Sequence, residues 1–332
     1  MGIRNSLFTA KGFSLTILFL AILSGCQSVR KTDVPVNQPA TEVYTTTKSG
    51  VIEEPQKAPD VPTQAAVPST TNTEDPKKSV NTKLAVILGP GGFGTYSQIG
   101  FLQGLQKSKI RIDYISGIEF GSLVAAMFAK KGQGFDVEWQ MMKLEPDVVL
   151  KTSMLSSDSR AQKINVMMPF LKEAFQGSTV ENSKVPFVCP ALNIQKQTVF
   201  FMNRGGYAEL LPFCIPMFPF FEPYQDNVAN VLGAKALADH LRTKGAHKII
   251  FVNVLPSKSM MKLKGASKET ETFWNQISYT ISRHLDGIDY VVQIPLGDSA
   301  FLSASQRREF IKQGQLAGQQ FGEVLLTKIN QQ

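Results

Sequence analysis

The stretch from Gly117 to Ser122 reads G-I-E-F-G-S and follows the apolar run at 112–116. Its spacing is that of a nucleophile elbow, G-x-S-x-G, in which a serine stands on a sharp strand-to-helix turn. Glu119 occupies the position of that serine. A carboxylate has no proton to give at neutral pH and is a weak nucleophile toward esters. The pattern therefore predicts an acyl-transfer site whose nucleophile has been replaced.

A glycine-rich loop lies upstream of this elbow, between a predicted strand at 84–88 and a predicted helix at 99–107. Backbone N–H groups of such a loop stabilise the oxyanion of an acyl-transfer reaction. With Gly89 the loop also satisfies G-x-G-x-x-G, the dinucleotide-binding pattern, but the second predicted strand does not end in the acidic residue that would bind a ribose. We therefore interpret the loop as oxyanion-loop-like, and its residues are Gly91, Gly92, Phe93 and Gly94.

Taken together, the loop and the elbow make the chain resemble the patatin-like phospholipase family from about residue 83 to 328. That family has a loop G-G-G-x-R/K-G, a helix with G-x-L, the elbow, and a downstream Asp-Gly pair. The matching positions here are the loop, Gly100 to Leu102, Gly117 to Gly121, and Asp226. The resemblance implies a fold with a serine–aspartate acyl hydrolase site.

Each catalytic element departs from the family pattern. Pro90 replaces the first loop glycine and has no N–H to donate. Gly94 stands in place of the basic residue, Thr95 in place of the last loop glycine, and Asn227 in place of the glycine after the aspartate. Because Glu119 replaces the nucleophile as well, we expect no catalytic residue for ester hydrolysis.

The sequence leaves three interpretations of Glu119 open. The fold has lost its activity and serves binding or scaffolding; or Glu119 and Asp226 form a carboxylate pair that holds a cation or does acid–base chemistry; or an acyl hydrolase activity persists. If the two carboxylates lie close together, like charge should raise one pKa. Asp226 is otherwise a turn residue. Neither Ser122, in the helix, nor Ser116, in the strand, is expected to replace the nucleophile.

Alternating apolar strands and helices must position these residues. Further strands are expected at 187–194, 197–201, 249–255 and 290–296, and helices at 121–132, 161–176, 234–245, 271–285 and 304–329. Continuous apolar strands of this kind are buried on both faces. The pattern predicts a three-layer α/β/α sandwich with a mostly parallel central sheet, of patatin-like type.

The first 25 residues contain Arg4 and Lys11 and then an apolar run, which is typical of an export signal. Leu23 to Cys26 resembles the lipobox of bacterial lipoproteins, in which the cysteine carries the lipid. Gln27 is not the aspartate that signals inner-membrane retention. We therefore expect a membrane partner through a lipid anchor at Cys26, and a location on the outer membrane facing the periplasm.

Residues 26–82 form the next predicted unit, a disordered tether. Seven of the 18 prolines of the chain lie in it, with little apolar patterning. Such a composition cannot bury enough surface to offset the entropy of ordering. The predicted organisation is a signal peptide at 1–25, a lipid-anchored tether at 26–82 and a patatin-like domain at 83–328.

Composition excludes several classes of function. The formal net charge is +8, but the basic residues are not interleaved with aromatic ones, so no nucleic acid partner is expected. The three histidines, His240, His247 and His284, are scattered, and no metal or cofactor is expected. Cys189 and Cys214 are either a disulfide of an exported domain or two buried apolar residues.

The run at 212–224, PFCIPMFPFFEPY, is rich in aromatic residues and prolines. Two interpretations stay open for it. It either forms a buried irregular crossing of the chain, or its aromatic side chains contact a lipid or an envelope protein.

Overall fold

The computed structural model describes residues 42–45, 82–150, 161–256, 260–263, 266–297 and 301–330 of the 332-residue chain. All of these belong to one unit, Pro39–Gln332. The predicted signal peptide, Cys26 and most of the predicted tether lie outside the described residues. Within the described part, no helix has both the length and the apolar character needed to cross a membrane.

Eight strands of the described residues form the central sheet, in the order β1-β8-β7-β2-β3-β4-β5, with β6 paired to β4. Strands β8, β7, β2, β3 and β4 run parallel, and β1, β5 and β6 pair antiparallel with their neighbours. The strand bounds are β1 (Glu42–Thr45), β2 (Leu84–Leu88), β3 (Tyr114–Gly117), β4 (Phe187–Asn193), β5 (Thr198–Met202), β6 (Asn227–Ala229), β7 (Lys248–Asn253) and β8 (Tyr290–Gln293).

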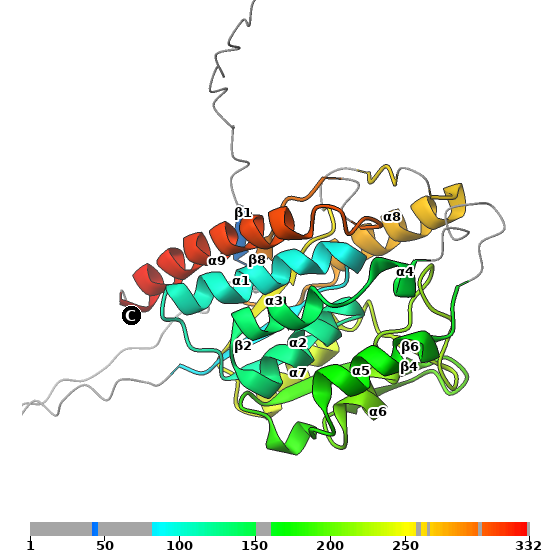
Figure 1. Ribbon diagram of the computed structural model, residues 1–332. Coiled ribbons are helices and arrows are strands. Elements are labelled where there is room, and N and C mark those ends of the chain that lie inside the picture. The colour runs from blue at the N-terminus through cyan, green and yellow to red at the C-terminus, as the bar shows by residue number, and fades with distance from the viewer. Residues whose placement is uncertain are drawn as a thin grey trace, which may run out of the picture. The chain divides into compact units, whose positions relative to one another are not determined.

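Helices cover both faces of this sheet, because right-handed crossovers place α1 and α2 on one face and α7 on the other. Figure 1 shows α1, α2, α3 and α9 in front of the sheet and α7 behind it. The helix bounds are α1 (Tyr96–Lys107), α2 (Phe120–Lys131), α3 (Gly134–Met141), α4 (Pro146–Val149), α5 (Met168–Phe175), α6 (Tyr207–Cys214), α7 (Ala234–Thr243), α8 (Lys268–Arg283) and α9 (Arg307–Asn330); short 3-10 turns are η1 (Gly92–Thr95), η3 (Ile164–Met167) and η4 (Val180–Asn182).

The predicted three-layer α/β/α sandwich with a mostly parallel sheet is confirmed. At the centre, Val86 of β2 is opposite Ile115 of β3 and Ile250 of β7, and all three side chains are buried. A helix predicted at 161–176 is shorter in the structure. It is a 3-10 turn, η3, followed by α5, because Pro169 has no N–H and is accommodated only at the start of a helix.

Strand β1 lies inside the segment predicted to be a disordered tether. It pairs antiparallel with β8, so that Glu42 is opposite Gln293 and Thr45 is opposite Tyr290. The sequence of β1, EVYT, contains the β-branched and aromatic residues that favour a strand. The structure therefore differs from the predicted disorder at these four residues, and for 26–41 and 46–81 the tether stays a prediction.

Helices α1 and α9 pack at very short distance in front of the sheet. A Cβ atom placed on Gly100 of α1 would lie 1.8 Å from the carbonyl oxygen of Ile311, and one placed on Gly314 of α9 would lie 1.7 Å from the carbonyl oxygen of Ser97. The absence of side chains at both glycines thus permits main chain to contact main chain. Because α1 begins where the glycine-rich loop ends, α9 also fixes the position of that loop.

Candidate functional site at the Glu119 elbow

Glu119 occupies the tip of a sharp turn between β3 and α2, as the elbow pattern predicts. Its backbone has φ 58° and ψ −131°, a region that residues other than glycine seldom adopt. Such a conformation costs on the order of 1 to 3 kcal/mol and persists only where the surroundings impose it. The turn therefore holds the side chain of residue 119 in one place.

Two glycines allow the strand and the helix of the elbow to approach this closely. A Cβ atom on Gly117 would lie 2.1 Å from the carbonyl oxygen of Gly121, and one on Gly121 would lie 2.5 Å from that of Leu88. Both contacts are with main chain, which cannot move aside without disturbing β2 or α2. The spacing of the glycines in the motif thus follows from the geometry of the turn.

The carboxylate of Glu119 binds the glycine-rich loop. Its Oε2 accepts hydrogen bonds from the backbone N–H of Gly91, at 3.0 Å, and of Gly92, at 3.1 Å. Gly92 has φ +52°, and a Cβ atom there would collide with the carbonyl oxygen of Phe301 at 2.5 Å. Backbone N–H groups so arranged would stabilise the oxyanion of an acyl-transfer reaction. Here they bind a carboxylate of the same chain.

The other groups of the loop have partners as well. The N–H of Phe93 donates to the carbonyl oxygen of Phe301, at 3.1 Å, and the N–H of Gly94 donates to that of Gly91, at 2.9 Å. Pro90 has no N–H. Every N–H of the loop from residue 90 to 94 is therefore engaged. The role of Phe301 was not predicted, because no motif marks a residue that contributes only its main-chain carbonyl.

Aromatic rings enclose the elbow. The ring of Phe120 lies 6.2 Å from that of Phe93, 5.4 Å from that of Phe220 and 6.1 Å from that of Phe221, centroid to centroid. Glu119 is completely buried beneath them. Two of these rings come from the aromatic run at 212–224, so this part of the run forms core, as one of its two interpretations predicts.

Burial raises the pKa of Glu119 from 4.5 to about 7, and the N–H groups of Gly91, Phe120 and Gly92 oppose this rise. The second carboxylate oxygen, Oε1, is buried and has no hydrogen-bond partner among the described residues. The sequence led us to expect that a neighbouring like charge would raise the pKa. The cause is instead the removal of the carboxylate from water.

Comparisons with known proteins show which family this segment of the chain resembles. The model of the family described as patatin-like phospholipase matches residues 86–228, a range that contains the loop, the elbow and Asp226. Over this range the chain is similar to the patatin-like phospholipase family.

The individual proteins that the chain resembles have low sequence identity to it. The chain is 25% identical over 190 residues to lysophospholipase NTE1 of two strains of Cryptococcus neoformans var. neoformans serotype D; this alignment covers 52% of the chain and 11% of the relative. The chain thus spans about a tenth of the length of these curated relatives. Among solved structures, VipD from Legionella pneumophila is similar with a TM-score of 0.46 and 11% identity, covering 74% of this chain and 68% of VipD.

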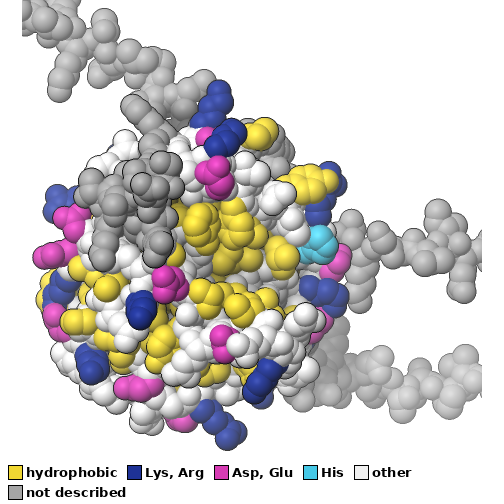
Figure 2. Space-filling view, turned by 90° about the vertical axis from the view of Figure 1, so that its right-hand side faces the viewer, with side chains coloured by type: hydrophobic (Ala, Val, Ile, Leu, Met, Phe, Trp, Pro, Cys, Tyr) yellow, Lys and Arg dark blue, Asp and Glu magenta, His cyan; other side chains and the backbone are white. Residues whose placement is uncertain are grey.

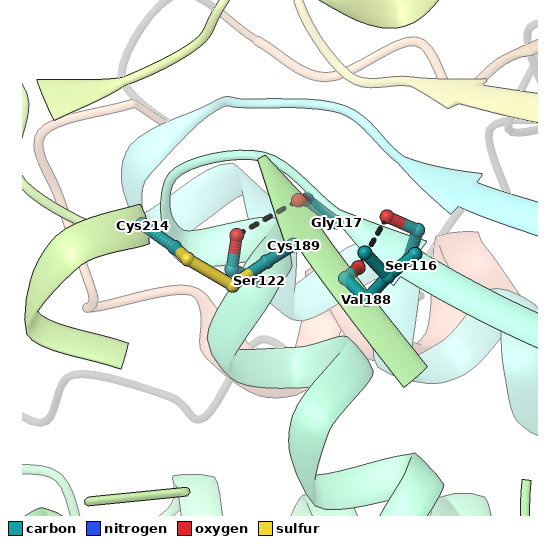
Figure 3. The surroundings of a disulfide bond; sticks show 6 residues. All are labelled: Ser116, Gly117, Ser122, Val188, Cys189 and Cys214. Atoms are coloured by element: carbon teal, nitrogen blue, oxygen red, sulfur yellow. Dashed lines mark hydrogen bonds between the residues drawn. A yellow bond between two sulfur atoms is a disulfide. The ribbon is translucent and has the colours of Figure 1, made fainter. Parts of the chain in front are cut away.

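The two serines beside the elbow of this patatin-like domain do not replace the missing nucleophile. Ser122 Oγ donates to the carbonyl oxygen of Gly117, at 2.8 Å, and Ser116 Oγ donates to that of Val188, at 2.5 Å (Figure 3). Both side chains are fully buried. Each hydroxyl has a structural partner, as expected for a serine in α2 and one in β3.

The structure does not bring Asp226 to Glu119. Asp226 is exposed, in a turn directly before β6, with φ 60°, and its carbonyl oxygen accepts a hydrogen bond from Ile194 N–H at 2.8 Å. Aspartate tolerates this left-handed conformation better than most residues. The groups that shift the pKa of Glu119 do not include Asp226. A turn position thus describes Asp226 better than membership of a carboxylate pair.

Cys189 and Cys214 form a disulfide with a Cα–Cα distance of 6.1 Å, linking β4 to the end of α6. Figure 3 shows the disulfide beside Ser122 and the start of α2. The structure therefore confirms the disulfide, which is one of the two interpretations of these cysteines. Among the described residues there is no cluster of three or more His, Cys, Asp or Glu side chains suited to a metal ion.

Proposed function

We propose that this protein is a pseudoenzyme of the patatin-like phospholipase family that acts by binding rather than by ester hydrolysis. One observation carries the proposal: the Glu119 carboxylate stands in place of a nucleophilic hydroxyl and binds the N–H groups of Gly91 and Gly92. The same side chain removes the attacking group and fills the position in which a substrate oxygen would develop its charge.

Hydrolysis would meet three obstacles at this site. An ester oxygen could reach the loop N–H groups only by displacing a carboxylate of the chain itself. An oxyanion formed there would face the buried Glu119 carboxyl, whose ionised form, populated as pH rises through its pKa of about 7, would repel the new negative charge. The aspartate expected to accept a proton, Asp226, lies in an exposed turn. These arguments also disfavour a repurposed pair of carboxylates.

The location is part of the same proposal. The sequence from Leu23 to Cys26 resembles a lipobox, and the residue after it, Gln27, favours the outer membrane. The Cys189–Cys214 disulfide supports an oxidising compartment such as the periplasm. We therefore place the binding function on a lipid-anchored protein at the periplasmic face of the outer membrane.

Ester hydrolysis by the full chain tests this proposal against its rival, an active lipid acyl hydrolase. We expect no release of p-nitrophenol from p-nitrophenyl butyrate, and no release of fatty acid from phosphatidylglycerol vesicles, above the rate without protein. Glu119→Ser should remain inactive too, because it restores a hydroxyl but not a nearby proton acceptor.

Glu119→Gln and Asp226→Ala are the controls for this assay. Hydrolysis by the native chain that is lost in either variant would refute the proposal and favour the acyl hydrolase. Activity that is unchanged in both would point to a contaminating esterase. A gain of activity in Glu119→Ser alone would show that the rest of the machinery is intact, which contradicts the arrangement of Asp226 described above.

A further inference from the structure

A cavity of about 210 Å³ opens at the edge of the sheet opposite the elbow. The first residues of β2, β7 and β8 line it, which are Leu84, Lys248 and Tyr290. The elbow instead follows the last residue of β3, which runs parallel to β2. Because parallel strands begin at one edge of a sheet and end at the other, the cavity is separate from the Glu119 site. In Figure 1 it lies near the C-terminal end of α9, at the left.

Basic side chains converge on this cavity. Among the described residues that line it, four are cationic, Lys109, Arg111, Lys248 and Lys328, and one is anionic, Asp113, which leaves a formal net charge of +3. The cations come from the segment after α1, the start of β7 and the end of α9. By contrast, the face in Figure 2 has Lys and Arg side chains interspersed with Asp and Glu around a hydrophobic centre. The fold thus gathers charge of one sign at the cavity.

The acidic side chain of the lining holds the arginine in place. Asp113 Oδ1 contacts Nε of Arg111 at 2.9 Å, and Asp113 Oδ2 accepts a hydrogen bond from the N–H of Leu84 at 2.9 Å. A guanidinium has five N–H groups, and this ion pair uses the one on Nε. The side chain of Arg111 is 79% exposed. Its terminal Nη groups, which bind phosphate in a bidentate manner in many proteins, are therefore accessible from solvent.

The lysines from β7 and α9 keep much of their charge available. Lys248 Nζ lies 3.6 Å from Asp289 Oδ1, but Asp289 Oδ2 binds the guanidinium of Arg242 at 2.7 Å. One carboxylate thus faces two cations and compensates Lys248 only in part. Lys328 Nζ lies 5.2 Å from the centre of the Tyr290 ring, a cation–π contact that restrains the ammonium without neutralising it.

Lys109 stands in a turn that usually contains glycine. Its φ is 58°, and its N–H donates to the carbonyl oxygen of Gln106 at 2.9 Å. The N–H of Ile110 donates to that of Leu105 at 2.9 Å, which completes the Schellman pattern of a helix end. Helix α2 ends in the same left-handed conformation with a glycine, Gly132. A lysine carries a steric cost here that a glycine would not, and strained positions of this kind occur most often at functional sites.

These features together select the ligand. The walls include the buried side chains of Leu84, Tyr290 and Leu325. Cations in a cleft with apolar walls attract an anion strongly, because the low dielectric concentrates the field. The volume is below the range of about 300 to 1,000 Å³ that is typical of larger organic ligands, which favours a small anion. We propose that this cavity binds a phosphate group, either free in solution or in the headgroup of a membrane lipid. The site goes beyond the proposed function and does not depend on it.

Equilibrium dialysis of the full chain in a non-ionic detergent, against radiolabelled inorganic phosphate, tests the site. Chloride keeps the ionic strength constant, so that general screening of charge does not change during the titration. We expect saturable binding of one phosphate per chain, and displacement of the label by excess unlabelled phosphate. Binding that does not saturate, or no binding, would overturn the proposal.

Three variants locate the binding. Arg111→Gln should lower the affinity about tenfold, because a charged hydrogen bond is lost. Lys109→Gly should lower it about threefold or more, while the urea midpoint of unfolding should not fall, since glycine adopts the left-handed turn freely. Lys107→Gln is the matched control: it removes one charge from an exposed side chain that does not line the cavity, and should bind like the native chain. Native affinity in both Arg111→Gln and Lys109→Gly, or an equal loss in Lys107→Gln, would refute the site.

The source of the phosphate group is decided in vesicles. The full chain is placed in phosphatidylcholine vesicles that contain phosphatidic acid or, at equal charge density, phosphatidylserine, and the dialysis is repeated. If phosphatidic acid alone competes with the labelled phosphate, the site takes a lipid headgroup. Equal effects of the two lipids, or no effect, assign the site to free phosphate.

The outcome is independent of hydrolysis at the elbow. Glu119→Gln should bind phosphate like the native chain, because Glu119 does not line the cavity. If the native chain hydrolyses esters, the proposed function fails and the phosphate site stands. If the native chain is inactive and binds no phosphate, only the phosphate site fails.

Discussion

The buried carboxylate of Glu119 should make the stability of the protein fall as pH rises through neutrality. Burial places its pKa at about 7 in the folded protein, against 4.5 for an exposed glutamate. The unfolded chain therefore releases this proton at a lower pH than the folded chain does. The stabilisation by the neutral form is complete below about pH 4.5 and is lost as pH rises through about 7.

The size of the effect follows from the shift. Each pKa unit corresponds to about 1.4 kcal/mol, so the whole shift corresponds to about 3 kcal/mol, of which about 2.5 kcal/mol falls between pH 5 and pH 8. Glu119→Gln keeps the shape of the side chain and cannot ionise. Relative to this variant, the native protein should lose about 2 to 3 kcal/mol of unfolding free energy over that range.

Urea unfolding of both proteins, followed by circular dichroism at several pH values, measures this difference. Other titrating groups are common to the two proteins and cancel in the subtraction, and so does the constant cost of the buried amide. A difference that is independent of pH would refute the reasoning, because it would mean that the carboxyl is solvated. A difference that favours the native protein at high pH would mean that a cation pairs with it.

Three further predictions concern the scaffold and can be checked by chemical denaturation. Replacing Cys189 and Cys214 by serine should lower the unfolding free energy by about 3 kcal/mol, because the disulfide spans 25 residues, and reducing agent should no longer affect the variant. Gly100→Val should lower the unfolding free energy by about 3 kcal/mol, because the new side chain forces α1 away from the main chain of α9. Gly297→Ala is the control and should change the unfolding free energy by less than about 0.5 kcal/mol, because the space around Gly297 is open. Asp226→Asn should also stay within about 0.5 kcal/mol, since its side chain is exposed; a large loss would show that this aspartate has a buried partner.

The sequence predicted the structure correctly where a short pattern of residues determines the local geometry. Continuous apolar runs predicted the parallel strands, since a strand that is buried on both faces has no polar positions. The two glycines at Gly117 and Gly121 predicted the sharp turn and therefore the position of Glu119. Two further predictions from the sequence agree with the structure. Pro90 offers no N–H to the loop, and Ser122 is not available as a nucleophile because its hydroxyl donates to the carbonyl oxygen of Gly117.

What the sequence could not reveal depends on contacts between distant segments. The family resemblance offered Asp226 as a possible partner of Glu119, but only the path of the chain between β5 and β6 decides whether the two lie close together. The hydrogen bonds from Gly91 and Gly92 to the carboxylate depend on a side-chain direction that no pattern encodes. Strand β1 was missed because four residues gain stability only from the free edge of β8.

The glycine-rich loop is held from the C-terminal third of the chain. Phe301 accepts a hydrogen bond from Phe93, and α9 presses against α1 through Gly314. The segment that matches the family model ends at residue 228, before both of these supports. A fragment cut at that boundary would keep the recognisable motifs and lose the parts that hold them in position. The family match therefore covers the loop and the elbow, whereas the elements that hold them in position extend to α9.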